Sequence, residues 1–365
     1  MTDQMPLLLR GDARNLPLPD ASVDLVVTSP PYFGLRDYGT DSQIGSEPSP
    51  QEFLDALIEC TAEMVRVLKP SGSLWVNLGD KYNSAASGQQ NGNGHAAKSG
   101  LAGGRHDRMM SRGTTTAAYP TKSLHLLPER YRIRCVDELG LIARAVIVWS
   151  KPNGLPESVT DRVRRSHEDW VHLTRLPRYF AAVDEIREPH AGEFLSSGAR
   201  NARYRKPGGR LPSELRGENS INRTPSGEWE ERPNSTANPL GKLPGSVWEV
   251  ATQPLNVPAE LGVDHFAAFP MEWPRRLILG WSPPDGTVLD PFGGTGTTAL
   301  VAAMLGRRGI SVDLSADYQR IATWRCNDPK ERARAAGLDP DQVAAIKPQL
   351  PGQESLLDLL GGEVA

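Results

Sequence analysis

The chain has 365 residues, of which 38% are hydrophobic and 23% charged, and its formal net charge is −3. This length suits one large α/β domain with an insert, or two domains, and the slight negative charge excludes a global basic field for nucleic acid, so any such contact must use local patches. The three scattered cysteines exclude a disulfide framework and show no metal-ligand spacing. We find no leader and no long apolar span, so we expect a cytoplasmic protein without a membrane partner or a bound metal.

Two apolar runs near the start of the chain predict buried parallel strands. Residues 7–9 end at Gly11-Asp12, and residues 23–27 lead through Thr28 into Ser29-Pro30-Pro31-Tyr32. Because two prolines cannot continue a strand ladder, the chain must leave the sheet there. Ligands of open α/β sheets bind beyond such carboxyl ends of strands. The hydroxyl, the rigid carbonyl and the aromatic ring of this tetrapeptide suit a planar base that carries an amino group; a plain strand-ending turn is the alternative.

These residues resemble the amino-methylating DNA methyltransferases. Gly11-Asp12, a strand and then Ser29-Pro30-Pro31-Tyr32 is the order of their circularly permuted (beta) class, in which the catalytic half precedes the cofactor half. The resemblance implies that Asp12 contacts the adenine of S-adenosyl-L-methionine and that Ser29, Pro30, Pro31 and Tyr32 are catalytic. Serine in the first position resembles the cytosine-N4 enzymes more than the adenine-N6 enzymes, which usually carry Asp or Asn there.

The next segments predict alternating helices and strands. Ser49 begins a helix that runs to Leu68 and ends in Lys69-Pro70-Ser71-Gly72, and residues 73–80 follow as a strand. Residues 83–119 are rich in Gly, Ser, Asn and Thr and are expected to form a mobile loop, either a DNA-contacting flap or a linker. Further along we expect a helix over 128–139 and strands over 144–149 and 170–174.

The segment before the last of these strands resembles the family over a longer pattern. It contains Lys151-Pro152-Asn153, Pro156-Glu157-Ser158, Asp161-Arg162 and His167-Glu168. We expect His167 to shape the pocket for the target base, without a role as a base or a metal ligand.

Residues 190–243 are polar, and their charge is opposite in sign to that of the whole chain. They hold nine basic residues against six glutamates. Five of the basic residues form a cluster without acids, with Tyr204 among them: Arg200, Arg203, Arg205, Lys206 and Arg210. Such a cluster suits phosphate contacts, and arginine also reads guanine edges. The resemblance places the target-recognition region here; a solvated loop is the alternative.

The last third of the chain predicts a second ligand-binding edge. Residues 287–290 form a strand that enters the glycine turn 290–296, and residues 309–313 form a strand that ends at Asp313. Glycines let the backbone approach a ligand, a helix amino terminus can hold a carboxylate, and a terminal acid suits ribose hydroxyls. Gly294-x-Gly296-x-x-Ala299 also satisfies the dinucleotide fingerprint, so a nicotinamide cofactor is the alternative.

Asp-Pro-Phe ahead of the glycines, together with Ser-Pro-Pro-Tyr, favours S-adenosyl-L-methionine. The resemblance also places Phe269, in the element His-Phe-x-x-Phe-Pro, beside the methionine part of this cofactor. The expected cofactor-binding residues are Asp12, Phe269, Asp290, Pro291, Phe292, Gly293, Gly294, Gly296 and Asp313.

Together these patterns predict a doubly wound, mostly parallel α/β sheet of seven strands with a hairpin-like last strand, which is the methyltransferase fold. We expect a catalytic half in residues 1–182, a target-recognition insert in 183–245, a cofactor half in 246–328 and a tail in 329–365. The resemblance implies a site-specific enzyme that flips the target base out of double-stranded DNA and methylates cytosine N4, with adenine N6 as the alternative. A DNA-binding protein with an inactive methyltransferase fold is an alternative of another class.

Two further partners are expected. Enzymes of this kind serve restriction–modification or phage and host DNA modification, so a cognate restriction endonuclease is one. In the tail, Gln353-Glu354-Ser355-Leu356-Leu357 resembles the peptide by which bacterial proteins dock on the sliding clamp. Because such pentapeptides recur by chance, a terminal helix is the more frequent meaning of this match.

Overall fold

The computed structural model describes residues 5–34, 43–83, 119–154, 156–189, 240–263 and 268–339. The chain forms two compact units, one of residues 1–182 with 246–365 and one of residues 183–245. In the second unit, a 3₁₀ helix, Val183–Ile186, precedes a bridge between Glu188 and Lys242. The sheet and the pocket described below belong to the first unit.

The first unit is built on an eight-stranded sheet with the order β1-β8-β7-β2-β3-β5-β4-β6. β5 runs antiparallel to both of its neighbours, and the other pairs are parallel. The strands are β1 (Leu7–Arg10), β2 (Val23–Thr28), β3 (Leu68–Leu78), β4 (Ile142–Ser150), β5 (His167–Thr174), β6 (Val247–Glu249), β7 (Thr287–Asp290) and β8 (Arg308–Asp313). The predicted doubly wound sheet with a hairpin is confirmed. It has one strand more than expected, because β6 adds to the edge of β4.

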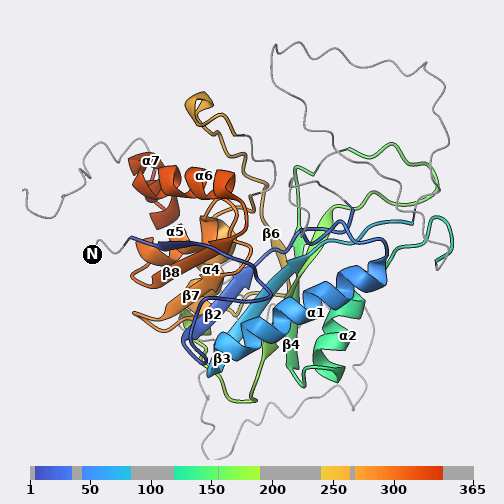
Figure 1. The fold of residues 1–365 in the computed structure, drawn as a ribbon, viewed down its shortest axis with the longest axis horizontal. Coiled ribbons are helices and arrows are strands. Elements are labelled where there is room, and N and C mark those ends of the chain that lie inside the picture. The colour runs from blue at the N-terminus through green and yellow to red at the C-terminus, as the bar shows by residue number, and fades with distance from the viewer. Residues whose placement is uncertain are drawn as a thin grey trace, which may run out of the picture. The chain divides into compact units, whose positions relative to one another are not determined.

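Helices cover both faces of this sheet, and Figure 1 shows α1 and α2 side by side on one of them. The helices are α1 (Pro50–Val67), α2 (Leu127–Asp137), α4 (Glu272–Trp281), α5 (Thr297–Met304), α6 (Ala316–Asn327) and α7 (Pro329–Ala336). On the α1 face, Phe53, Leu54 and Leu57 pack in one cluster with alternate residues of the central strands, such as Val26 and Leu74. The side chains between them face the other side, where Trp281 of α4 lies against Trp75 of β3. Alternation along the strands therefore serves both layers.

The ends of α1 show what the sequence predicts well and what it predicts poorly. Ser49 caps the helix by accepting a hydrogen bond from the Glu52 amide, as the capping pattern predicts. The other end differs from the prediction, because Lys69–Gly72 belong to β3. Val23 pairs with Leu68 and Leu25 pairs with Ser73, so these four residues form a bulge in the strand.

The C-terminal boundary also differs from the expected one. Residues 329–336, which we assigned to the tail, form α7, whose Ala333 and Ala335 are buried and which packs against α5 and α6. Buried Glu331 pairs with Arg325 of α6 at 2.8 Å.

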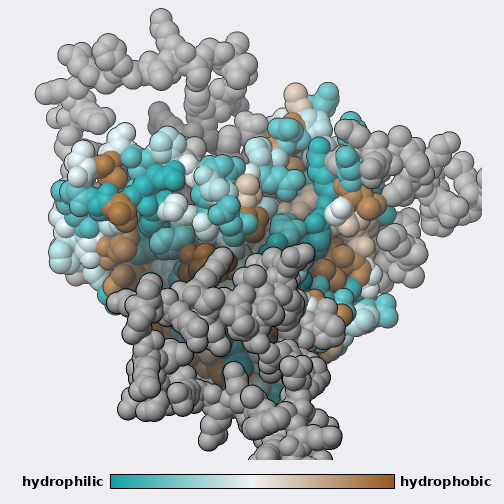
Figure 2. Space-filling view, turned by 180° about the vertical axis from the view of Figure 1, so that it is seen from behind, coloured by the Kyte–Doolittle hydropathy of each residue, from teal (hydrophilic) through white to brown (hydrophobic). Residues whose placement is uncertain are grey.

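On the face shown in Figure 2, hydrophilic residues predominate and the hydrophobic ones form separate small patches. None of the helices in the described ranges is long and apolar enough to cross a membrane.

The strand order places the site. β2, from the first part of the chain, lies beside β7, from the last part, and Leu25 pairs with Val288 and Val26 with Leu289. The strand that leads into Ser29 and the strand that leads into the glycine turn therefore end next to each other at the carboxyl edge of the sheet.

Candidate active site

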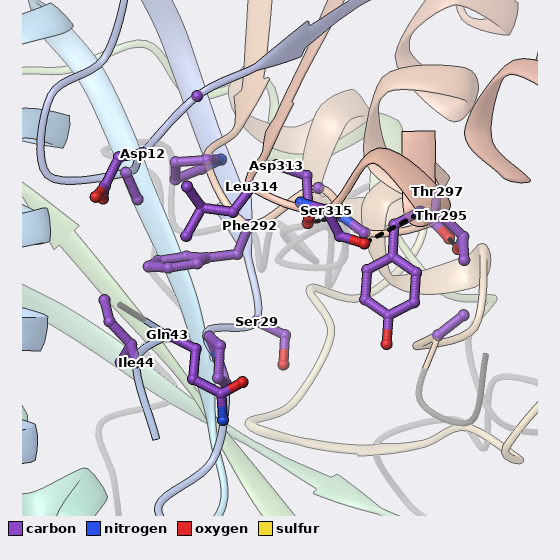
Figure 3. A pocket seen from close by; sticks show the side chains of 18 of the residues that line it. Asp12, Ser29, Gln43, Ile44, Phe292, Thr295, Thr297, Asp313, Leu314 and Ser315 are labelled. Carbon is purple, nitrogen blue, oxygen red and sulfur yellow. Dashed lines mark hydrogen bonds between the residues drawn. The ribbon is translucent and has the colours of Figure 1, made fainter. Parts of the chain in front are cut away.

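A pocket with about 940 Å³ of empty volume, its open mouth included, lies beyond the carboxyl ends of β1, β2, β7 and β8. Ser29 and Gln43 lie across it from Asp313 and Leu314 (Figure 3). Of the predicted residues, the pocket brings together Asp12, Ser29, Pro31, Phe269, Pro291, Phe292, Gly293, Gly294 and Asp313. It also contains residues that we did not predict: Gly11, Ala13, Gln43, Ile44, Ala268, Thr295, Thr297, Leu314, Ser315 and Tyr318.

Backbone amides fix Asp313 at the end of β8. The Gly294 amide donates to Oδ2 at 2.8 Å, and the Ser315 amide donates to Oδ1 at 2.7 Å. Burial raises the pKa of this carboxyl above its ordinary value, and the two amide hydrogen bonds oppose the rise. Each carboxylate oxygen has a second lone pair, so Asp313 can still accept hydrogen bonds from a ligand in the pocket.

The glycine turn is shaped by two kinds of constraint. A Cβ on Gly293 would lie 1.8 Å from Ser311 Oγ, so a side chain there would push the turn away from β8. Gly294 and Gly296 have φ values of 49° and 74°, in the region that favours glycine. Gly293 and Gly294 line the pocket, whereas Gly296 caps α5 and packs towards Ala322.

Asp12 lines the pocket and is paired. The Arg14 guanidinium donates from Nη2 to Oδ2 at 2.7 Å and from Nε to Oδ1 at 3.1 Å. This hydrogen bonding lowers the pKa of Asp12, so the carboxylate is charged at neutral pH. We did not predict Arg14 as the partner of Asp12.

Asp290 lies behind the pocket lining and joins the two halves of the sheet. It is 1% exposed. Its oxygens accept hydrogen bonds from Thr28 Oγ1 at 2.6 Å, Thr298 Oγ1 at 2.9 Å and the Phe292 amide at 3.1 Å. Burial raises its pKa to about 6, against the effect of these bonds. We predicted a direct cofactor contact here, but the geometry is that of a clamp between the end of β2 and the first turn of α5.

Ser29 lines the pocket beyond the end of β2, and Asn77 of β3 fixes its hydroxyl. Ser29 Oγ donates to Asn77 Oδ1 at 3.2 Å, and the Asn77 side-chain amide donates to the Asp169 carbonyl at 3.2 Å. The second bond fixes which end of the amide faces Ser29. Because the hydroxyl proton is directed to Asn77, the lone pairs of Ser29 Oγ remain as acceptors beside the pocket. A single polar residue in the apolar run Trp75-Val76-Asn77-Leu78 was the available signal for Asn77.

Two residues of the predicted tetrapeptide, Pro30 and Tyr32, are not among the residues that line the pocket. The Tyr32 hydroxyl lies 2.8 Å from Asn77 Oδ1 and 2.8 Å from Glu168 Oε2. His167, which we expected to shape the target pocket, is exposed at the start of β5. Successive strand residues face opposite sides of a sheet, and Glu168, the next residue, is the one that reaches the Tyr32 hydroxyl.

Several predictions fall outside the described residues and stay predictions. The basic cluster Arg200, Arg203, Arg205, Lys206 and Arg210, the peptide Gln353–Leu357 and nearly all of the 83–119 segment are among them.

Comparisons with known proteins agree with this geometry. The family model described as DNA methylase matches residues 23–323. The Type II methyltransferase M.Cfr9I of Citrobacter freundii is 35% identical over 320 residues, which are 87% of this chain and 86% of that protein. The Type II methyltransferase M.SmaI of Serratia marcescens is 32% identical over 320 residues, which are 87% of this chain and 89% of that protein.

Among solved structures, the PvuII DNA methyltransferase, named as cytosine-N4-specific, has the same fold. It matches with a TM-score of 0.56 and 19% sequence identity, and the match covers 94% of each chain. The predicted family is confirmed by the sequence matches, and with it the predicted cofactor. The chain belongs to the DNA methylase family of amino-methylating enzymes and is an S-adenosyl-L-methionine-dependent DNA methyltransferase.

Proposed function

We propose that this enzyme transfers the methyl group of S-adenosyl-L-methionine to the exocyclic N4 amino group of cytosine in double-stranded DNA. The observation that carries the proposal is the Ser29 hydroxyl, which lines the pocket with its proton directed to Asn77 Oδ1. Ser29 is therefore an acceptor for a hydrogen of an amino group. The serine in Ser-Pro-Pro-Tyr favours cytosine, and the same geometry serves adenine N6 as the alternative.

A base amino group is a poor nucleophile, because its lone pair is delocalised into the ring. Ser29 Oγ and the Pro30 carbonyl would accept its two hydrogens and hold the nitrogen so that the lone pair points at the methyl group. The N–C bond would form as the S–C bond of the bound methyl donor breaks, and the nitrogen would then release one proton to water. Asn77 is an amide and takes up no proton, so the residues act by positioning and by hydrogen bonding.

Residues from both halves of the chain would hold S-adenosyl-L-methionine. Asp313 would accept from the ribose hydroxyls, and Asp12 from the adenine amino group. Phe292 is in the pocket between them and offers an apolar face, and the glycine turn lets the cofactor approach the backbone. We propose Asp290 as a residue that positions this turn, since its oxygens bond Thr28, Thr298 and the Phe292 amide.

We further propose residues 183–245 as the target-recognition region and place the enzyme in a restriction–modification system with a cognate endonuclease. The excess of three basic charges in residues 190–243 supports the first proposal. The second is supported by the relatives, which are named Type II methyltransferases. Changing Arg203, Arg205 and Lys206 together to glutamine should lower the slope of log K against log salt by about three or less, with cofactor affinity unchanged. An unchanged salt slope would place the phosphate contacts elsewhere.

The proposed reaction is tested by the base that becomes modified. The gene is expressed in bacteria without DNA methylation, the DNA is digested to nucleosides, and mass spectrometry separates N4-methylcytosine from N6-methyladenine and from ring-methylated cytosine. We expect N4-methylcytosine, and sequencing of the modified positions then gives the recognition site. Methyladenine alone would overturn the cytosine assignment and leave the fold and the cofactor intact.

A further inference from the structure

A chain of polar side chains crosses four neighbouring strands at the carboxyl edge of the sheet. The sheet order there is β2-β3-β5-β4. Tyr32 follows β2, Asn77 lies in β3, Glu168 lies in β5 and Lys151 follows β4. Because β5 is antiparallel, its first residues lie at the edge where the other three strands end. The hairpin is thus what brings a carboxylate to Tyr32.

This chain holds the Tyr32 hydroxyl on two sides. Its single proton faces two acceptors, Asn77 Oδ1 and Glu168 Oε2, each at 2.8 Å. The other oxygen of Glu168, Oε1, pairs with Lys151 Nζ, and the two side chains are only 15% and 18% exposed. Lys151 Nζ also lies 4.1 Å from the centre of the Trp149 ring. A carboxylate fixed in this way at both oxygens cannot turn away from the phenol.

The ring of Tyr32 is also held from behind, by Gly79 at the end of β3. A Cβ on Gly79 would lie 2.8 Å from Tyr32 Cε2, 3.2 Å from Cδ2 and 3.3 Å from Cζ. The ring therefore rests directly on the backbone at Gly79, in space that any side chain would take. Since its hydroxyl is bonded on two sides, the ring cannot swing away to make room for an added methyl group.

We propose that Glu168, Lys151 and Gly79 are positioning residues that fix the Tyr32 ring as a platform on which the flipped target base stacks beside Ser29. The inference rests on the proposed function, because a platform needs a base that has left the duplex. Burial, followed by the neighbouring Glu168 carboxylate, raises the pKa of Tyr32 well above its ordinary value. The phenol thus stays protonated, and its one proton lies between the two acceptors.

A double-mutant cycle tests whether Glu168 acts through Tyr32. Glu168→Ala and Tyr32→Phe should each lower kcat/KM for methyl transfer into DNA by about tenfold, since both remove the charge-assisted hydrogen bond between the phenol and the carboxylate. The double variant should be no slower than either single one, because both changes remove the same contact. Melting temperature and cofactor affinity serve as folding controls. Full activity of Glu168→Ala, or additive losses in the double variant, would overturn the proposal.

Two more variants allow the proposal to be tested even if Glu168→Ala does not fold. Glu168→Gln can still accept the phenol proton and should keep most of the parent rate. A Glu168→Gln protein that folds normally but has lost its activity would contradict the role of the hydrogen bond. Gly79→Ala should lower kcat by about 10²-fold, the scale for a reacting group misplaced by about 1 Å, with cofactor affinity unchanged. A fully active Gly79→Ala enzyme would overturn the platform.

The rates are followed as labelled methyl groups incorporated into DNA, whichever base receives them. A parent enzyme that methylates adenine would overturn the proposed cytosine specificity, while the cycle between Tyr32 and Glu168 would still report on the platform. With the recognition site known, a fluorescent cytosine analogue at the target position reports stacking directly. We expect weaker quenching in Glu168→Ala and Gly79→Ala than in the parent, and equal quenching would contradict the proposal.

Discussion

The two halves of the pocket obtain their polarity in different ways. At the edge beside β2, which we propose as catalytic, side chains bond to one another across strands, as Ser29 and Tyr32 do to Asn77. At the edge beside β8, which we propose for the cofactor, backbone amides of Gly294 and Ser315 fix a single acid, Asp313. A network of side chains sets the direction of a donor or acceptor within fractions of an ångström, which a reacting nitrogen requires. A frame of backbone amides and glycines gives close approach and a fixed acceptor, which binding requires.

The strongest way to break this comparison is Ser29→Ala. The change removes one acceptor for the target amino group, while the prolines that follow keep the turn. We expect methyl transfer to fall by about 10²-fold or more, the scale for one preorganised hydrogen bond in the transition state, with cofactor affinity unchanged. Ser22→Ala is the matched control, because Ser22 precedes the same strand and its hydroxyl bonds only the Pro19 carbonyl in the described structure. A fully active Ser29→Ala enzyme would contradict the role of the hydroxyl.

Asp313→Ala addresses the other half. Loss of the acid should weaken S-adenosyl-L-methionine binding by about 1–3 kcal/mol, or about 5- to 150-fold, because the ribose hydroxyls and two backbone amides lose their partner. Calorimetry on the folded variant measures this. Asp317→Ala, an exposed acid that pairs with Arg320 on α6, is the control and should bind normally. Unchanged affinity of Asp313→Ala would show that the ribose lies elsewhere.

Asp290→Asn sharpens the comparison at the place where the halves join. The pKa of Asp290 is raised from 3.8 to about 6 by burial, so the folded protein favours the protonated acid. Its contribution to stability is complete below about pH 4 and is lost as the pH rises through about 6. Asparagine stays neutral and does not lose this contribution. The difference in free energy of unfolding, variant minus parent, should therefore be about 1–3 kcal/mol larger at pH 7 than at pH 4.

Denaturant unfolding at both pH values gives this difference, and parallel pH profiles would contradict it. The parent alone is a poor reporter, because His172 titrates in the same range with the opposite sign. Burial lowers the pKa of His172 to about 3, so it costs stability as the pH falls below about 6.5. The comparison of the parent with Asp290→Asn cancels the His172 contribution.

Much of the fold could be predicted from the sequence, because its signals are local. Apolar runs that end in prolines or glycines predicted the strands of both halves, and the Ser49 cap predicted the start of α1. The bulge at Lys69–Gly72 was missed because it depends on pairing with β2, which lies elsewhere in the chain. The edge strand β6 was missed for a similar reason, since three residues carry no periodicity of their own.

The site shows the same limit. About half of the residues that line the pocket were predicted, because they belong to contiguous motifs. The residues that support them come from other strands. Asn77, Glu168 and Thr28 were not predicted in these roles, because the sequence does not show which residues of distant strands become hydrogen-bond partners. Asp290 was assigned to the cofactor because its motif is contiguous with residues that do line the pocket.

The most direct measurement compares one variant from each half of the pocket, Ser29→Ala and Asp313→Ala. It follows their single-turnover rates of methyl transfer as the cofactor concentration is raised to saturation. We predict that Asp313→Ala approaches the parent rate at saturation, because its defect is in binding. Ser29→Ala should stay about 10²-fold slower at every concentration, because its defect is in the transition state. A Ser29→Ala rate restored by excess cofactor, or an Asp313→Ala rate that stays low at saturation, would contradict the division between a catalytic and a cofactor-binding edge.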